Sequence, residues 1–575
     1  MTDTDSITEH DMSRFDHRKY SPAPKVTGFT RTWPDQEITR APIWVSEDLR
    51  DGNQALLEPM TVEQKQKLFK LLVDIGVKEI MVGFPSASQP DYDFVRWLID
   101  ENQIPEDVTI AALTQCRDHL IDKTFESLDG VPKAIIHLYN STSTVQRERV
   151  FEMSQDGIID IAVGGAKRVK ENARARPGVD WRLEYSPESF STTEMDFAVR
   201  ICEAVMDVWE PTPADRIIFN LPNTVEQVGP HYHADQIEYF CQNVKNRESV
   251  IVSVHTHNDR GGAVAAAELA MLAGAERVEG TLLGNGERTG NMDMVVLAMN
   301  LYSMGVDPEL DLSNPDEIVR VVHECTGIAL HPRHPWVGEL VYTAFSGSHQ
   351  DAIRKSLRKQ QDDEPWQVAY LAIDPRDIGR DYQAVIRVNS QSGKGGMAFL
   401  LERDYGINLP RWMMLALAPH VQAASEKITG ELGSPEIRDL LFTHFDRQTP
   451  ISLVDYSVRR AGEGQKISVT VTENGEQFTL EGQGNGPLSA FVASWNARTG
   501  DDLMIADYAE QAVSAGSDAD AIAFVQIKSG TVRIPAVAED ADTLSASIKA
   551  IISAINLSRE TDDTGQRGGL TALAS

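Results

Sequence analysis

The stretch SVIVSVHTHNDRGGAVAAAELAMLAGA, residues 249–275, contains a strand pattern followed directly by a helix pattern. Its first part, VIVSV, is a strongly apolar run with the length of a buried strand. Two histidines, an Asn-Asp-Arg tripeptide and a glycine pair follow, and the remainder has helical spacing. A buried strand with polar residues at its carboxyl end, followed by a helix, is typical of parallel α/β folds.

The same alternation extends from about residue 40 to residue 305. We predict eight buried strands in the runs PIWVS, KEIMVGF, VTIAALT, AIIHLYN, WRLEYS, RIIFNLP, VIVSVHTH and RVEGTLLG. Helical segments such as TVEQKQKLFKLLVDIG separate most of them. This number of strands and this length predict an α/β fold, the (β/α)8 TIM barrel. The alternative, a doubly wound open sheet, calls for a glycine-rich turn after the first strand, and SEDLRDGNQ is not of that kind.

The rest of the chain lacks this regular alternation of strand and helix patterns. We expect an N-terminal extension over residues 1–39, the barrel as catalytic domain over 40–315, mainly helical linker subdomains over 316–440, and a C-terminal α+β domain over 441–575. In the linker, VIRVNSQSGKGG predicts a strand that runs into a turn over residues 385–396. In the C-terminal domain, ISVTVTENGEQFTLEGQG predicts two strands around an Asn-Gly turn. The helical GPLSAFVASWNA, the strand DAIAFVQIK and the helical ADTLSASIKAIISAIN indicate a domain of two related halves.

Composition narrows the class of protein. The chain has 575 residues, enough for two or three domains, and a formal net charge of −32. A surface this acidic argues against binding to nucleic acid or to anionic membranes. The four cysteines have no paired spacing, and neither a signal-peptide core nor a membrane-spanning apolar run is present. We therefore expect a cytoplasmic protein.

Polar residues gather at the carboxyl ends of the expected strands. In a parallel barrel this end forms the open, functional face. The residues that we assign to it are Arg50, Asp51, Gln54, His137, Tyr139, Glu184, Ser186, Glu188, Asn220, Thr224 and Asn291. Because we expect few polar groups within the strands themselves, this distribution favours an active-site rim over a structural pattern.

A metal site is predicted at one side of this rim. His255 and His257 are two residues apart on a strand, so their side chains point the same way. Asp51 follows the first strand, which lies next to the eighth once the barrel closes. The Asn291 amide is a further candidate ligand. Two imidazoles, a carboxylate and an amide suit Mg²⁺, Mn²⁺ or Zn²⁺. A lone histidine would more often be a core residue, whereas this pair favours the metal site.

Arg50 precedes the candidate ligand Asp51. It can simply pair with Asp51 or Glu47, but its place on the rim favours stabilisation of negative charge during a reaction.

Seven blocks in order, DLRDGNQ, GFPSASQ, IHLYNSTS, EYSPE, FNLPNTVE, HTHNDRG and GNGERTGN, resemble the 2-isopropylmalate synthase family in its longer bacterial form. The resemblance continues through HPWVGELVYTAFSGSHQDAI and VNSQSGKGG and covers about residues 30–450. It implies a metal-dependent Claisen condensation of acetyl-CoA, as cosubstrate, with 3-methyl-2-oxobutanoate, the first committed step of leucine biosynthesis. It also implies a homodimer, and leucine as a feedback inhibitor bound by the C-terminal domain.

The resemblance also assigns roles to residues. It implies Mg²⁺, with Mn²⁺ or Zn²⁺ as alternatives, at the positions Asp51, His255, His257 and Asn291. It implies a catalytic set consisting of Arg50 for charge stabilisation, Glu188 or His349 as the base, and Tyr382 nearby. His349 and Tyr382 are expected to reach the barrel of the other subunit. His137, Ser186 and Thr224 match the keto-acid pocket.

Other functions remain as alternatives. Citramalate and homocitrate synthases differ mainly in the pocket for the keto-acid side chain. Hydroxymethylglutaryl-CoA lyase lacks a regulatory domain of this kind. Barrel hydrolases carry the His-x-His pair on the first strand, and an inactive amino-acid sensor is not expected to retain Arg50 and Asp51 beside both histidines.

Overall fold

The computed structural model describes residues 17, 20, 25–380, 394–427, 432–462, 464–512 and 520–564. The chain divides into two compact units, Met1–Val341 and Tyr342–Ser575. The division falls within the range expected to be linker. Most of the strand and turn expected at residues 385–396 lies outside the described residues.

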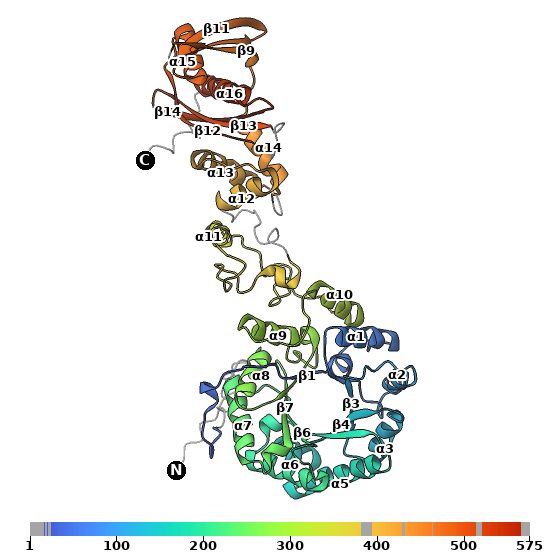
Figure 1. Ribbon diagram of the computed structural model, residues 1–575. Coiled ribbons are helices and arrows are strands. Elements are labelled where there is room, and N and C mark those ends of the chain that lie inside the picture. Colours follow the sequence, from blue (N-terminus) through green and yellow to red (C-terminus); the bar gives the residue numbers. More distant parts are fainter. Residues whose placement is uncertain are drawn as a thin grey trace, which may run out of the picture. The chain divides into compact units, whose positions relative to one another are not determined.

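The first unit contains a closed barrel of eight parallel strands, each paired with its neighbours in chain order and β8 paired with β1 (Figure 1). The strands are β1 Ile43–Ser46, β2 Glu79–Met81, β3 Thr109–Gln115, β4 Lys133–Ser141, β5 Asp180–Glu188, β6 Ile217–Asn223, β7 Val250–Thr256 and β8 Arg277–Gly280. All eight coincide with the apolar runs identified in the sequence, which confirms the TIM-barrel prediction.

Helices surround the barrel (Figure 1). They are α1 Val62–Asp74, α2 Gln89–Asp100, α3 Asp118–Ser127, α4 Thr144–Gln146, α5 Gln155–Arg174, α6 Met195–Trp209, α7 Pro230–Asn243, α8 Ala263–Leu272, α9 Met294–Ser303 and α10 Pro315–Thr326. Local signals explain their starts. Thr61 accepts from the backbone N–H of Gln64 while the Gln64 side chain accepts from that of Thr61, so two otherwise unpaired donors at the start of α1 are satisfied.

Successive side chains along each strand point alternately toward the surrounding helices and toward the barrel interior. On β6, the ring of Phe219 points outward and packs edge-on against Phe240 of α7, with ring centroids 6.0 Å apart. Its neighbour Ile218 points inward and joins an interior apolar cluster with Ile135 and Ile251. Because both faces of each strand are buried, the strands appear in the sequence as continuous apolar runs.

The expectation that few polar groups lie within the strands is wrong. Arg277 of β8 is fully buried and is surrounded by three carboxylates from barrel strands. Its Nε donates to Glu79 of β2 at 2.7 Å, and its Nη1 donates to Glu279 at 2.6 Å. Both terminal nitrogens donate to Glu184 of β5 at 3.0 Å. These charges are tolerated inside the barrel because they pair with one another.

The second unit begins with helices α11 Gly347–Leu357, α12 Lys394–Tyr405, α13 Arg411–Ser425 and α14 Ser434–Phe445. Three antiparallel strands and a helix follow: β9 Ile451–Ala461, β10 Gly464–Glu473, β11 Glu476–Gly484 and α15 Pro487–Thr499. The same order then repeats: β12 Leu503–Ala512, β13 Ala521–Ser529, β14 Val532–Asp540 and α16 Thr543–Thr564. The prediction of an α+β domain with two related halves is confirmed.

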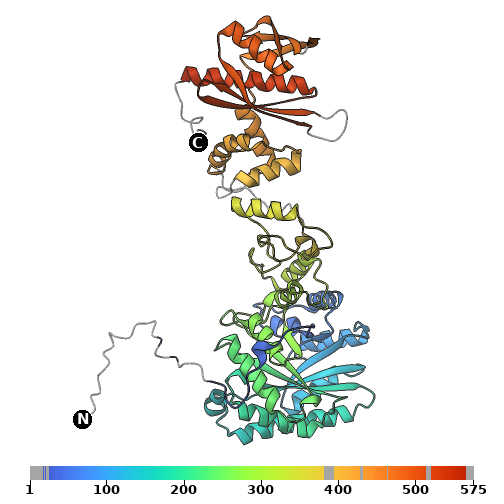
Figure 2. The same cartoon turned by 60° about the vertical axis from the view of Figure 1, so that its left-hand side comes forward.

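The two halves share one core. Val525 and Ile527 of β13 face a cluster that includes Trp495 of α15 and Ile551 of α16. Phe524, which directly precedes Val525 in the strand, points to the opposite face and packs with α12–α14. Helix α16 covers its sheet in Figure 2. The period of two therefore gives β13 two buried faces, which explains its apolar sequence.

None of the helices in the part of the chain that the structure describes combines the length and apolar character needed to cross a lipid bilayer.

We predict that Phe219→Ala lowers the free energy of unfolding of the barrel by about 3–5 kcal/mol, because it leaves a cavity between strand and helix. Phe151→Ala is the matched control, since this ring is 41% exposed and its loss is expected to cost less than about 0.5 kcal/mol. Hydrogen exchange of β5–β7 peptides, followed by mass spectrometry, reports this difference. Equal protection in both variants would contradict the packing described here.

Candidate active site

The turn after β1 is fixed by Asp48. This buried carboxylate accepts the backbone N–H of Leu282, after β8, at 3.1 Å and the hydroxyl of Ser46 at 2.8 Å. Burial raises the pKa of Asp48 to about 7, although these hydrogen bonds oppose the rise. The side chain of Asn285 donates to the carbonyl of Gly52 at 2.8 Å and adds a second link. The loops that follow the first and eighth strands are thereby joined.

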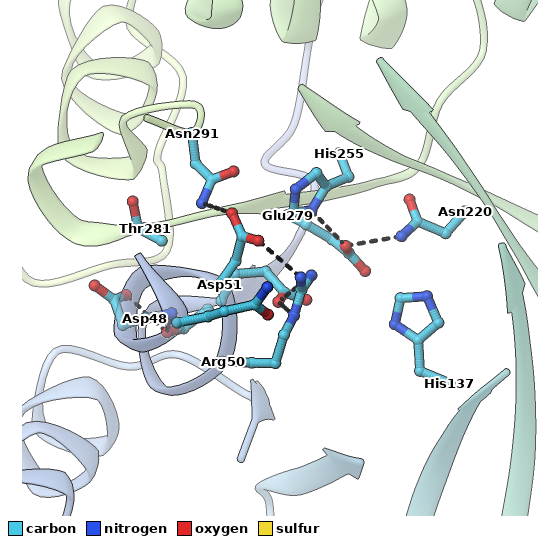
Figure 3. Close-up of polar contacts among 12 residues, drawn as sticks. Asp48, Arg50, Asp51, His137, Asn220, His255, Glu279, Thr281 and Asn291 are labelled. Atoms are coloured by element: carbon cyan, nitrogen blue, oxygen red, sulfur yellow. Dashed lines mark hydrogen bonds and ion pairs between the residues drawn. The ribbon is translucent and has the colours of Figure 1, made fainter. Parts of the chain in front are cut away.

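This turn presents Arg50 and Asp51 to the barrel interior (Figure 3). The Arg50 guanidinium donates from Nε to Glu47 at 2.7 Å and from Nη1 to Asp51 at 2.8 Å. Burial alone would raise the pKa of Asp51, but Arg50 and the nearby histidines hold it well below its usual range. Asp51 is therefore ionised, and Arg50 is held in one orientation.

His255 and His257, at the end of β7, converge with Asp51. The two imidazole Nε2 atoms are 3.1 Å apart, and His257 Nε2 lies 4.0 Å from Asp51 Oδ2. One ligand atom from each of these three buried residues lies within 4.8 Å of the other two. The side chains thus point to one place, as the sequence analysis expected.

Asn291 completes this group. Its backbone bridges to His257, and its Nδ2 donates to Asp51 Oδ2 at 2.7 Å. Its Oδ1 is buried and has no hydrogen-bond partner in the part of the chain that the structure describes. Burial, followed by the effect of His255, lowers the pKa of His257 to about 3, so this imidazole is neutral. A carboxylate, imidazole lone pairs and an unsatisfied amide oxygen fit a divalent cation.

Behind this cluster lies Glu279 of β8, which the sequence analysis did not select. Its Oε2 is 3.0 Å from His255 Nδ1 and accepts from Asn220 Nδ2 at 2.8 Å. Burial alone would raise the pKa of Glu279, but Arg277 holds it well below its usual range. The signal was present in the sequence, because Arg277 and Glu279 are two residues apart in the short run RVEG and therefore face the same side.

A cavity of about 710 Å³ opens beside the cluster, and the predicted substrate-binding residues and Glu188 line it. Its lining includes Arg50, Asp51, His255 and His257, together with His137 of β4, Ser186 and Glu188 of β5, and Thr224 after β6. Phe84, Leu113 and Gln115, at the ends of β2 and β3, also line it and were not selected from the sequence. Phe84 and Leu113 are apolar and give no distinct chemical signal in the sequence.

Each predicted substrate-binding residue has a hydrogen bond or a protonation state that the structure defines, and so does Glu188. Burial lowers the pKa of His137 to about 3, so the ring is neutral. Ser186 Oγ donates to the carbonyl of Asn220 at 3.2 Å. Thr224 Oγ1 accepts the backbone N–H of Ser189 at 3.0 Å. Glu188 accepts a hydrogen bond from the hydroxyl of Ser141.

The remaining two catalytic candidates do not belong to the described part of the barrel unit. His349 lies on α11 in the second unit, where its ring stacks on Tyr370 with centroids 4.0 Å apart. Tyr382 lies outside the described residues. Their expected reach into another subunit therefore stays a prediction.

Comparison with known families agrees with this architecture. A model described as HMGL-like matches residues 41–322, and one described as the alpha-isopropylmalate synthase post-catalytic domain matches residues 339–402. A model described as the LeuA allosteric (dimerisation) domain matches residues 431–558. The closed barrel and the cluster at the ends of its strands define the first unit as a TIM-barrel enzyme domain of the HMGL-like class.

Comparison with individual relatives identifies the family within this class. A 2-isopropylmalate synthase from Azotobacter vinelandii is 51% identical over 541 residues, covering 94% of this chain and 96% of the relative. One from Rhodospirillum rubrum is 50% identical over 547 residues, covering 94% and 98%. The chain belongs to the 2-isopropylmalate synthase family, and it is an acyltransferase.

Among solved structures, an HMG-CoA lyase from Bacillus subtilis overlaps 51% of this chain and 96% of its own, with 18% identity and a TM-score of 0.41. This likeness is too low to support any inference about function.

We predict that Asp51→Asn weakens Mn²⁺ binding by more than about 100-fold, because a ligand loss should exceed the 10- to 100-fold effect of losing a partner behind a ligand. Asp259→Asn is the control, since this carboxylate follows β7, the strand that ends in the two histidines, but pairs with Arg288. Electron paramagnetic resonance of free Mn²⁺ during a titration measures both affinities. Wild-type affinity in Asp51→Asn would contradict the ligand assignment.

Proposed function

We propose that this chain catalyses the Claisen condensation of acetyl-CoA with 3-methyl-2-oxobutanoate, giving 2-isopropylmalate and CoA, and that leucine inhibits it. The main support is the combination of 51% identity to a 2-isopropylmalate synthase over 94% of the chain with a ligand cluster beside Arg50. In this reaction the acetyl methyl group loses a proton and its carbon forms a bond to the keto carbon. Water then cleaves the thioester and releases CoA.

A divalent cation, expected to be Mg²⁺ with Mn²⁺ or Zn²⁺ as alternatives, would be held by Asp51, His255, His257 and Asn291. When bound, it supplies a Lewis acid that polarises the carbonyl of the keto acid. The support is the donor set: two imidazoles, an ionised carboxylate and an amide oxygen without another partner among the described residues.

Arg50 is assigned the stabilisation of negative charge on the keto oxygen as the new carbon–carbon bond forms. Its guanidinium is held by Glu47 on one side and Asp51 on the other, and it lines the cavity. Donors fixed before the reaction are effective because they need not reorganise as charge develops. The rigid ion pairs therefore support a catalytic role for Arg50.

The keto acid is assigned to the part of the cavity lined by His137, Ser186 and Thr224. A neutral His137 can donate or accept one hydrogen bond without adding charge. Its Nδ1 lies 3.5 Å from the buried carboxylate of Glu184, and the residue lines the cavity. These properties suit an oxygen of the substrate.

The base that removes the methyl proton is assigned to Glu188 or His349, with Tyr382 nearby. Glu188 lines the same cavity as Arg50, so its carboxylate is on the correct side of the barrel. Ser141 orients it by a hydrogen bond. Proton abstraction by a positioned carboxylate contributes typically 10²- to 10⁴-fold to such reactions.

Leucine inhibition and a homodimer are assigned to the C-terminal domain. Residues 431–558 match a domain described as allosteric and dimerising. The two related halves of this domain, each with three strands and a helix, pack on one shared core. A ligand bound to such a domain can regulate the barrel only if it binds two states with different affinity.

We predict that CoA release, followed with a thiol reagent in the presence of Mg²⁺, is fastest with 3-methyl-2-oxobutanoate. Pyruvate and 2-oxoglutarate should give a lower kcat/KM, because their side chains differ in size or charge from the isopropyl group. Removal of the metal with a chelator should stop turnover, and added Mg²⁺ should restore it. A higher kcat/KM with pyruvate or 2-oxoglutarate would indicate a citramalate or homocitrate synthase instead.

Leucine is predicted to reduce the rate of CoA release by the intact chain, whereas D-leucine, of equal composition and opposite chirality, should have no effect. The physical reason is that a folded site distinguishes enantiomers, while non-specific effects of an amino acid do not. Rates are compared at fixed substrate concentrations across a series of each compound. Full activity at saturating leucine would disprove the assignment of inhibition.

A further inference from the structure

The carboxylate of Glu279 accepts hydrogen bonds from Arg277 and Asn220 and contacts His255. Its side chain is almost fully buried, with 1% of the residue exposed. Oε1 accepts from Arg277 Nη1 at 2.6 Å. Oε2 accepts from Asn220 Nδ2 at 2.8 Å (Figure 3). The third partner is His255 Nδ1, 3.0 Å from Oε2. A buried carboxylate with these contacts has little freedom to rotate.

This contact determines which ring nitrogen of His255 carries the proton. An ionised carboxylate can only accept hydrogen bonds, so the Nδ1 that faces Glu279 must be the donor. In the neutral imidazole, His255 Nε2 then keeps its lone pair, and this is the nitrogen that lies 3.1 Å from His257 Nε2. The same arrangement, a carboxylate behind a histidine ligand, orients the ring and raises its basicity in metalloproteins.

We propose that Glu279 is a positioning residue of the metal site. It holds His255 in the tautomer and orientation that direct Nε2 toward the cation. The inference rests on the proposed function, because that function requires a cation between Asp51 and the two histidines.

A purely structural role is the competing explanation, since Glu279 is also a counter-ion of Arg277 in the barrel interior. Glu79 provides a matched control for this role. It accepts from Arg277 Nε at 2.7 Å and lies 3.7 Å from Arg182, and 7% of the residue is exposed. Loss of either carboxylate removes one negative charge beside Arg277, but only Glu279 contacts His255.

The test is isothermal titration of the metal-free full-length protein with Mn²⁺, for the wild type, Glu279→Gln and Glu79→Gln. We expect the Kd of Glu279→Gln to rise about 10- to 100-fold and that of Glu79→Gln to remain at the wild-type value. Turnover of Glu279→Gln should recover as Mn²⁺ is raised, because the defect lies in metal binding. The visible absorption of bound Co²⁺ should also change in Glu279→Gln alone.

Other results of this titration would overturn either the positioning role or the proposed function. Wild-type affinity in Glu279→Gln, or an equal loss in Glu279→Gln and Glu79→Gln, overturns the positioning role. Absence of Mn²⁺ binding by the wild type overturns the proposed metal-dependent function as well, so the two failures are distinguishable. If Glu279→Gln does not fold, Glu279→Asp decides: it keeps a negative charge in the barrel interior but withdraws the carboxylate from His255 Nδ1 by the length of one methylene. It is expected to bind Mn²⁺ weakly, and wild-type affinity in this variant overturns the proposal.

Discussion

The pairing of β8 with β1 is the constraint on which the candidate site depends. Four registered residue pairs, from Ile43 with Arg277 to Ser46 with Gly280, close the sheet into a barrel. Without closure, the loop after the first strand and the end of the seventh would lie at distant parts of an open sheet. With closure, Asp51 and the two histidines at the end of β7 face one interior. Asp48 strengthens this junction, because its carboxylate binds the backbone at the end of β8.

Closure of the barrel also places more acidic than basic side chains in its interior. The interior side chains around the site include the carboxylates of Glu47, Asp51, Glu79, Glu184 and Glu279 and the guanidinium groups of Arg50 and Arg277. Burial raises the pKa of Glu47 to about 7 and that of Glu184 well above its ordinary value, despite the guanidinium beside each. A divalent cation at the candidate site would offset part of this negative charge, so the candidate site and the ionic network form one electrostatic arrangement.

Most of the fold could be predicted from the sequence because its strands are buried on both faces. Such strands, for example RIIFNLP and DAIAFVQIK, produce apolar runs that interleave clearly with amphipathic helices. Arg277, Glu79 and Glu279 were not identified from the sequence, and Glu184 was assigned to the rim although it is buried inside the barrel beside Arg277. In strands as short as RVEG, a charged residue looks like a strand end, although Arg277 lies inside the barrel. His255 and His257 could be paired by alternation along one strand, whereas Glu279 reaches His255 only through the register of β7 with β8. The register between two strands depends on tertiary packing, so it cannot be predicted from the sequence of either strand alone.

The most direct test of this account is anomalous X-ray diffraction from crystals grown with Mn²⁺ and 3-methyl-2-oxobutanoate. We predict an anomalous peak inside the barrel within about 2.3 Å of Asp51, His255 Nε2 and His257 Nε2, with the keto acid in the adjoining cavity. A peak elsewhere, with these three side chains unliganded, would contradict it.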